Sequence, residues 1–217
     1  IFSNIVLIDE INRAPAKTQA ALFEVMEERQ ITIDGKQYTM EAPFMVLATQ
    51  NPIEQEGTYA LPEAQLDRFL FKIEVDYPSM EEEVMILQTH HNRKGKLPDA
   101  EIEPVLEPEK LMELHQQIFE IRVEEKLMHY IAQLIDKTRN HPHLYLGASP
   151  RASIAIMNAS KAFAAINGRD FIIPEDIKKS LVPVLGHRII LSPDREMEGM
   201  TAAGVIEMIT QSIEIPR

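Results

Sequence analysis

The chain has no cysteine and no tryptophan, and aromatic residues make up only 6% of its 217 residues. The lack of cysteine excludes disulfides and thiolate metal sites and suits a cytoplasmic protein. No apolar run approaches the ~20 residues that span a bilayer, so we expect no membrane insertion. Lysine and arginine are too few to balance the acids, and the net charge is -12. Nucleic-acid binding is therefore not expected, because such proteins usually present a basic face.

Two adjacent acids, Asp9 and Glu10, directly follow a short branched apolar run at residues 5–8. Such a run predicts a strand buried on both faces of a sheet. Carboxylates at the end of that strand lie where open α/β sheets bind ligands. One use of this arrangement is nucleotide hydrolysis, with one acid on Mg²⁺ and the other on the attacking water. For this pair alone, two acids at an exposed strand end are an equally good interpretation.

A phosphate-binding P-loop is absent from the sequence. The Gly-Lys pairs Gly35-Lys36 and Gly95-Lys96 lack both the following Ser or Thr and the glycine five positions before. The sequence also opens on the predicted strand without an initiator Met. We therefore expect a fragment of a longer protein, and we expect the fragment alone to bind ATP weakly and to be inactive.

The remaining pattern predicts an α/β part followed by helices. In order, we expect a helix over 16–28, a β-hairpin over 31–40 around Asp34-Gly35, a strand over 44–48, a loop over 53–58, a short helix over 62–68 and a strand over 69–75. A helix follows from Ser79, and the stretch 92–108 is typical of a linker. Later helices are expected to begin at Ser149, Pro174 and Thr201. The predicted divisions are 1–78, 79–108 and 109–217.

Three further polar residues are candidates for a site, and each has a simpler interpretation. Asn51 follows the second strand, although Asn before Pro is ordinary in turns. Arg68, at the end of a short helix, would usually be a solvated charge. Arg151 in a first helical turn opposes the helix dipole and so indicates a nearby anion. Taken alone, Arg151 is better explained by a plain salt bridge with an acid.

The order of these features resembles that of AAA+ ATPases, and specifically of the MoxR type. Residues 9–14 are similar to the Walker B segment of that family, 48–52 to sensor 1, 66–69 to the arginine-finger segment and 147–152 to sensor 2. The resemblance covers essentially the whole chain and leaves out only the P-loop part. It implies an α/β fold in which a partial AAA+ core, a three-layer remnant with a parallel sheet and a hairpin insertion, precedes an all-α lid.

The resemblance also implies residue roles in ATP hydrolysis. Asp9 would bind Mg²⁺ through water, Glu10 would activate the attacking water, and Asn51 would orient it. Arg151 would reach the nucleotide from the lid, whereas Arg68 would point into the site of a neighbouring subunit. A ring, commonly a hexamer, is therefore implied. The family remodels or matures partner complexes, often with a protein that bears a von Willebrand factor A domain.

Other interpretations remain open at this point. A nucleotide-independent scaffold, or an AAA+ motor associated with a chelatase or with DNA, would share much of this layout. The pairs His90-His91 and His141/His143 could bind a metal but have no obvious third ligand. The hairpin at 31–40 could face a pore, a partner or simply solvent. No role can be derived for His187-Arg188 from the sequence.

Overall fold

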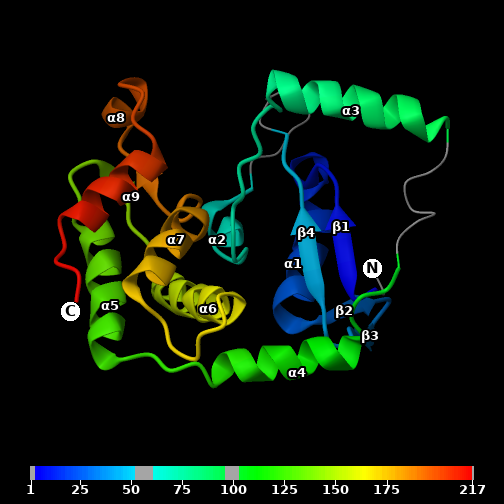
Figure 1. Ribbon diagram of the computed structural model, residues 1–217, viewed down its shortest axis with the longest axis horizontal. Helices are drawn as coiled ribbons and strands as arrows, with labels where there is room; N and C mark the ends of the chain where they lie inside the picture. Colours follow the sequence, from blue (N-terminus) through cyan, green and yellow to red (C-terminus); the bar gives the residue numbers. More distant parts are fainter. Residues whose placement is uncertain (1–2, 52–60, 96–102, 217) are drawn as a thin grey trace.

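The computed structural model describes residues 3–51, 61–95 and 103–216. An N-terminal α/β part and a C-terminal helical part lie side by side, and α3 (Met80–Arg93) and α4 (Pro108–Phe119) cross the top and bottom of the view (Figure 1). The loop expected at 53–58 and residues 96–102 of the expected linker lie outside the described residues.

The α/β part contains a parallel strand pair with a helix beside it. β1 pairs with β4 so that Ile8 lies opposite Ala48, and both strands end at the same edge. The elements of this part are β1 (Ile5–Ile8), a 3₁₀ turn (Ile11–Arg13), α1 (Ala16–Glu28), β2 (Gln30–Ile33), β3 (Lys36–Thr39), β4 (Met45–Ala48) and α2 (Glu63–Leu66). The predicted helix at 16–28 and the strand at 44–48 are confirmed within one residue.

The predicted β-hairpin is confirmed as the antiparallel pair β2–β3. Asp34 and Gly35 form its tip with φ of 52° and 76°, the positive values that a two-residue hairpin turn requires. The Thr32 hydroxyl donates a hydrogen bond of 3.0 Å to Glu24 on α1. The hairpin is thus tied to the helix that precedes it.

The expectation that β1 is buried on both faces is wrong for the described residues. Ile5 and Leu7 are 56% and 67% exposed, and Met45 and Leu47 on β4 are about half exposed. The alternate residue Ile8 packs toward the small cluster that includes Phe23 of α1. Among the described elements only one face of this strand pair is covered, so burial alternates along it.

The expected strand at 69–75 is also wrong, because these residues form no strand and pair with none in the described part of the chain. Its backbone turns instead to the helical part, where the Lys72 amide donates to the Pro183 carbonyl at 2.8 Å. Phe71 packs against the core of the helices, while Val75 is 89% exposed. A β-rich sequence without an adjacent strand edge does not form a strand.

The helical part holds the larger core. Its further elements are α5 (Glu125–Arg139), β5 (Leu144–Leu146), α6 (Pro150–Ile166), α7 (Pro174–Leu185), β6 (Ile190–Leu191), α8 (Pro193–Met197) and α9 (Ala202–Gln211). Buried side chains from α5, α6, α7 and α9 form one cluster that includes Tyr130, Ile156, Leu181 and Val205. Each such side chain contributes ~1.5–3 kcal/mol when it leaves water.

The helix starts agree with the sequence, with one difference in detail. Ser79 and Glu82 form a reciprocal capping box on α3, and Thr201 accepts from the Gly204 amide at the start of α9. Ser149 occupies the N-cap position of α6, but its hydroxyl makes no cap and donates instead to Asp67. In the part of the chain that the structure describes, no helix has both the length and the apolarity to cross a membrane.

Candidate active site

The ends of β1 and β4 bring together three of the predicted site residues. The Thr49 hydroxyl donates to Asp9 Oδ1 at 2.5 Å and accepts from the Glu10 amide at 2.9 Å. The Asn51 side-chain amide donates to Glu10 Oε1 at 3.5 Å. Two carboxylates and an amide therefore share one edge of the strand pair, as their position after neighbouring parallel strands predicted.

The backbone after β1 fixes the direction of Glu10. Glu10 has a left-handed φ of 50°, which is uncommon outside glycine and here turns the chain into the 3₁₀ turn. The next residue, Ile11, is 1% exposed, and its carbonyl accepts from the buried Gln19 side chain. Asn12 donates to the Asn51 carbonyl at 3.3 Å. Thr49 and Asn12, to which the sequence pattern assigned no role, hold the two strand ends together.

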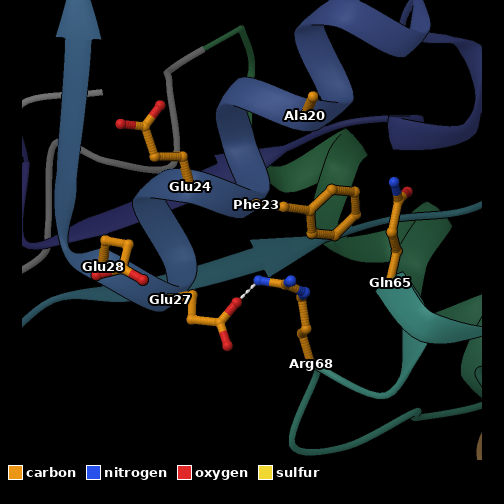
Figure 2. A pocket seen from close by; sticks show the side chains of 7 residues that line it. All are labelled: Ala20, Phe23, Glu24, Glu27, Glu28, Gln65 and Arg68. Carbon is orange, nitrogen blue, oxygen red and sulfur yellow. Dashed lines mark ion pairs between the residues drawn. The ribbon is translucent and has the colours of Figure 1, made fainter.

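The predicted arginines Arg68 and Arg151 meet on a single acid, Glu27 in the last turn of α1. Arg68 forms an ion pair with one carboxylate oxygen, which Figure 2 shows, and Arg151 donates to the other at 3.0 Å. Arg151 is thus paired with an acid, which was the simpler interpretation of its position. All three side chains remain between one third and just over half exposed.

The site residues fall into two groups, one at each end of α1. Asp9 and Glu10 precede this helix, whereas Glu27 lies in its last turn. The Ile11 carbonyl accepts from Gln19, so about eight helical residues, or roughly 12 Å along α1, separate the start of the 3₁₀ turn from Glu27, with which both arginines pair. The structure therefore does not bring Arg68 or Arg151 to Glu10.

A surface hollow of about 380 Å³ lies beside Arg68 and Glu27 (Figure 2). Glu24, Glu27 and Glu28 of α1 and Arg68 contribute to its wall. Three carboxylates around one guanidinium make this hollow acidic. In the separate chain it is therefore unsuited to phosphate, which would have to displace Glu27 from the arginines.

A buried arginine joins the segment around Arg68 to the helical part. Arg188 follows α7, is 8% exposed, and donates through Nε to Asp67 Oδ1 at 2.9 Å. Burial lowers the pKa of Arg188, and the hydrogen bond and charge of Asp67 act in the opposite direction. Ser149 donates to the same carboxylate at 3.1 Å. These partners are far apart in sequence, so no local pattern could reveal them.

The neighbouring His187 faces the same segment. Its Nε2 lies 2.9 Å from the Phe69 carbonyl, and because a carbonyl only accepts, Nε2 carries the proton. Burial is the main reason that the pKa of His187 falls to about 4. The imidazole is therefore neutral near pH 7.

The side chains at the ends of β1 and β4 offer oxygen donors, the kind of ligand that Mg²⁺ takes. Asp9 and Thr49 offer oxygen donors, and Mg²⁺ takes few protein oxygens while it keeps several waters. Within residues 3–51, 61–95 and 103–216 no group of three or more His, Asp or Glu side chains could hold a metal directly. His141 and His143 contact each other edge to face, with ring centroids 5.1 Å apart.

Comparison with known proteins places the chain in a family. The family described as "ATPase family associated with various cellular activities (AAA)" matches residues 1–71, and the AAA lid domain matches residues 136–209. A protein from Cytophaga hutchinsonii, solved by crystallography and provisionally described as an ATPase, superposes with a TM-score of 0.92 at 39% identity. This match covers 100% of this chain and 68% of that one.

Curated relatives extend the match. The uncharacterized protein YeaC of Bacillus subtilis is 44% identical over 100% of this chain and 67% of its own length. Chaperone MoxR1 of Mycobacterium tuberculosis is 41% identical over 100% of this chain and 59% of its own length. Protein MoxR of Paracoccus denitrificans is 30% identical over 88% of this chain and 61% of its own length. The chain thus spans about 59–67% of these relatives. With its α/β core, helical lid and these relatives, the chain belongs to the MoxR family of AAA+ ATPases.

Proposed function

We propose that the full-length protein hydrolyses ATP at sites shared between neighbouring subunits of a ring. The observation that supports this most directly is the separation of the two groups along α1, with the carboxylates near its first turns and the arginines on Glu27 in its last turn. One subunit would contribute Asp9, Glu10 and Asn51, and its neighbour would contribute Arg68 and Arg151. Neither group forms a complete site within one chain. The site would be completed when the carboxylates of one subunit face the arginines of its neighbour.

Asp9, Glu10 and Asn51 would carry the chemistry. Asp9 would hold Mg²⁺ through water, and the metal, when bound, would neutralise charge on the phosphates. Glu10 would accept a proton from the attacking water. Asn51, whose amide already lies 3.5 Å from Glu10, would orient that water by hydrogen bonding. The buried contacts of Ile11 and Asn12 would hold Glu10 in place.

The arginine group would stabilise the phosphate charge that develops during transfer. The resemblance implied that Arg68 alone acts on the neighbouring subunit. Because Arg68 and Arg151 share Glu27, we infer instead that both act on the same nucleotide, that of the neighbour. An arginine supplied in this way is worth ~10³–10⁵ in rate. Release of both arginines from Glu27 would accompany formation of the subunit interface, which would make hydrolysis depend on assembly.

The biological output we propose is chaperone-like remodelling or maturation of partner protein complexes in the cytoplasm. One relative is named as a chaperone, which supports this class of activity. A hexamer and a partner with a von Willebrand factor A domain are part of the proposal by family resemblance. We also propose that residues 1–78 form the C-terminal part of the nucleotide-binding core and that 109–217 form the lid. Residues 79–108 would be a helix and linker between them.

The test is Mg²⁺-dependent ATP hydrolysis by the full-length protein across a concentration series, with Glu10→Gln and Arg68→Ala alongside. We expect activity per subunit to rise with concentration as assemblies form. Both variants should lose at least ~10²-fold in kcat, and Glu10→Gln should still bind ATP. Assembled protein that binds no ATP would favour a nucleotide-independent scaffold, and hydrolysis that is unchanged without Arg68 would contradict a site shared between subunits.

A further inference from the structure

We propose that Arg188 is a positioning residue that fixes the backbone around Arg68 to the helical lid. The inference rests on the proposed function, in which Arg68 acts on the nucleotide of the neighbouring subunit. Arg188 does not touch that site and would act through the segment 67–70. Lid and arginine finger would then move as one body.

The contacts of Arg188 flank Arg68 on both sides. Besides the Asp67 carboxylate, Nη2 donates to the Asp67 carbonyl at 3.0 Å and to the Phe69 carbonyl at 2.6 Å. Nη1 donates to the Leu70 carbonyl at 3.1 Å. A single guanidinium therefore holds the backbone immediately before and after Arg68.

The segment depends on these donors because it has no strand partner. Residues 67–70 lie after α2 and outside any strand in the described part of the chain, so their carbonyls find no sheet ladder. Buried carbonyls without donors cost free energy. The planar fork of arginine reaches several of them at once, whereas the single ammonium of lysine cannot reproduce this geometry.

Other lid residues strengthen the same connection. His187 donates to the Phe69 carbonyl, Ser149 donates to Asp67, and the Lys72 amide donates to Pro183. The side chain of Arg188 is the most buried of these, at 3% exposure. Arg188 is therefore at the centre of the contact between the lid and residues 67–70.

A second arginine, paired with a buried carboxylate, supplies the matched control. Arg169 binds Asp176 through both oxygens at 2.6 and 2.7 Å, and the Asp176 side chain is 2% exposed. Both residues belong to the helical part, and none of their hydrogen bonds reaches residues 67–70. Arg169→Lys thus disturbs a comparable arginine–carboxylate pair without touching the finger segment.

The test compares Arg188→Lys with Arg169→Lys in the full-length protein, each with and without Arg68→Ala. A misplacement of about 1 Å costs ~10²-fold in rate, so we expect Arg188→Lys to lower kcat by ~10–100-fold with KM changed less than ~threefold. In the Arg68→Ala background Arg188→Lys should cause no further loss, because both changes disable the same group. Arg169→Lys should leave kcat nearly unchanged in both backgrounds.

Hydrogen exchange gives a readout that does not depend on hydrolysis. The Lys72 amide should lose protection in Arg188→Lys and keep it in Arg169→Lys. If Arg188→Lys fails to fold, Ser149→Ala should show the same pattern with a smaller, ~2–5-fold loss in kcat. Equal losses in kcat with and without Arg68 would overturn the proposal, as would unchanged protection of Lys72. Wild-type hydrolysis by Arg68→Ala alone would instead overturn the proposed function and this inference with it.

Discussion

At the scale of single residues, Glu27 is the acid that connects the two predicted arginines. Arg68 lies 41 positions after it and Arg151 lies 124 positions after it, so no sequence pattern could identify it as their common partner. An exposed ion pair is worth only ~0.2–1 kcal/mol, which a phosphate with greater charge can outcompete. We therefore expect Glu27 to limit nucleotide binding by holding both arginines.

Replacement of Glu27 by Gln should lower KM for ATP in the full-length protein by about two- to fivefold, because it removes the competing charge from both arginines. Steady-state hydrolysis at several ATP concentrations measures this effect. Glu24→Gln is the control, because Glu24 lines the same hollow but accepts from Thr32. An unchanged or higher KM in Glu27→Gln would contradict the competition.

His187 gives the stability of the protein a pH dependence. Its pKa is lowered to about 4 in the folded chain, mainly by burial, from an ordinary value of 6.5. Between these values the unfolded state binds more protons than the folded state. The contribution of the neutral His187 to folding stability is therefore complete above pH 6.5 and is lost as the pH falls toward 4. We expect the free energy of unfolding, measured in urea, to fall less between about pH 7.5 and about pH 5 in His187→Gln than in wild type.

The exposed His129 provides the comparison for this experiment. Its side chain is 74% exposed on α5. His129→Gln should therefore retain the full wild-type loss of stability at the lower pH. If stability falls between the two pH values as much in His187→Gln as in His129→Gln, burial of the His187 imidazole is not the source of the pH dependence.

At the scale of elements, local patterns predicted the helices and the hairpin but not what the segment 69–75 does. Helix α1, the turn at Asp34-Gly35 and the cap at Thr201 depend on residues close in sequence, and all were predicted. A strand depends on a partner edge, and the structure gives this segment lid contacts from Pro183 and Arg188 instead. The partner Arg188 stands 121 positions from Asp67. Asp9, Glu10 and Asn51 were predicted to meet because they follow two neighbouring parallel strands. No such pattern relates Arg188 to Asp67.

Two glycines of the helical part should respond to alanine in opposite directions. At Gly147, before α6, a Cβ would lie 2.5 Å from the Arg139 Cα, so Gly147→Ala should destabilise the protein by ~1–3 kcal/mol. At Gly204 in α9, a Cβ meets only the Thr201 hydroxyl at 3.4 Å, and Gly204→Ala should stabilise by ~0.5–1 kcal/mol. Urea midpoints measure both effects. Similar stability in the two variants would show that the backbone at Gly147 and Arg139 can shift to make room for the Cβ.

At the scale of the whole molecule, the lid and the α/β part meet where the arginines lie. Glu27 of α1 pairs with Arg151 of α6, and Arg188 after α7 holds the segment of Arg68. A rearrangement of the lid would therefore move the arginine group of one subunit relative to the carboxylates of the next. This geometry offers a physical route by which hydrolysis in a ring could drive movement of bound partners.

The most direct test of the shared site mixes two inactive variants of the full-length protein. Glu10→Gln subunits retain their arginines, and Arg68→Ala subunits retain Asp9, Glu10 and Asn51. In mixed assemblies some interfaces combine the intact halves, so hydrolysis should rise well above the sum of the separate variants. Mixed assemblies, verified by native mass spectrometry, that hydrolyse ATP no faster than that sum would contradict a site built from two subunits.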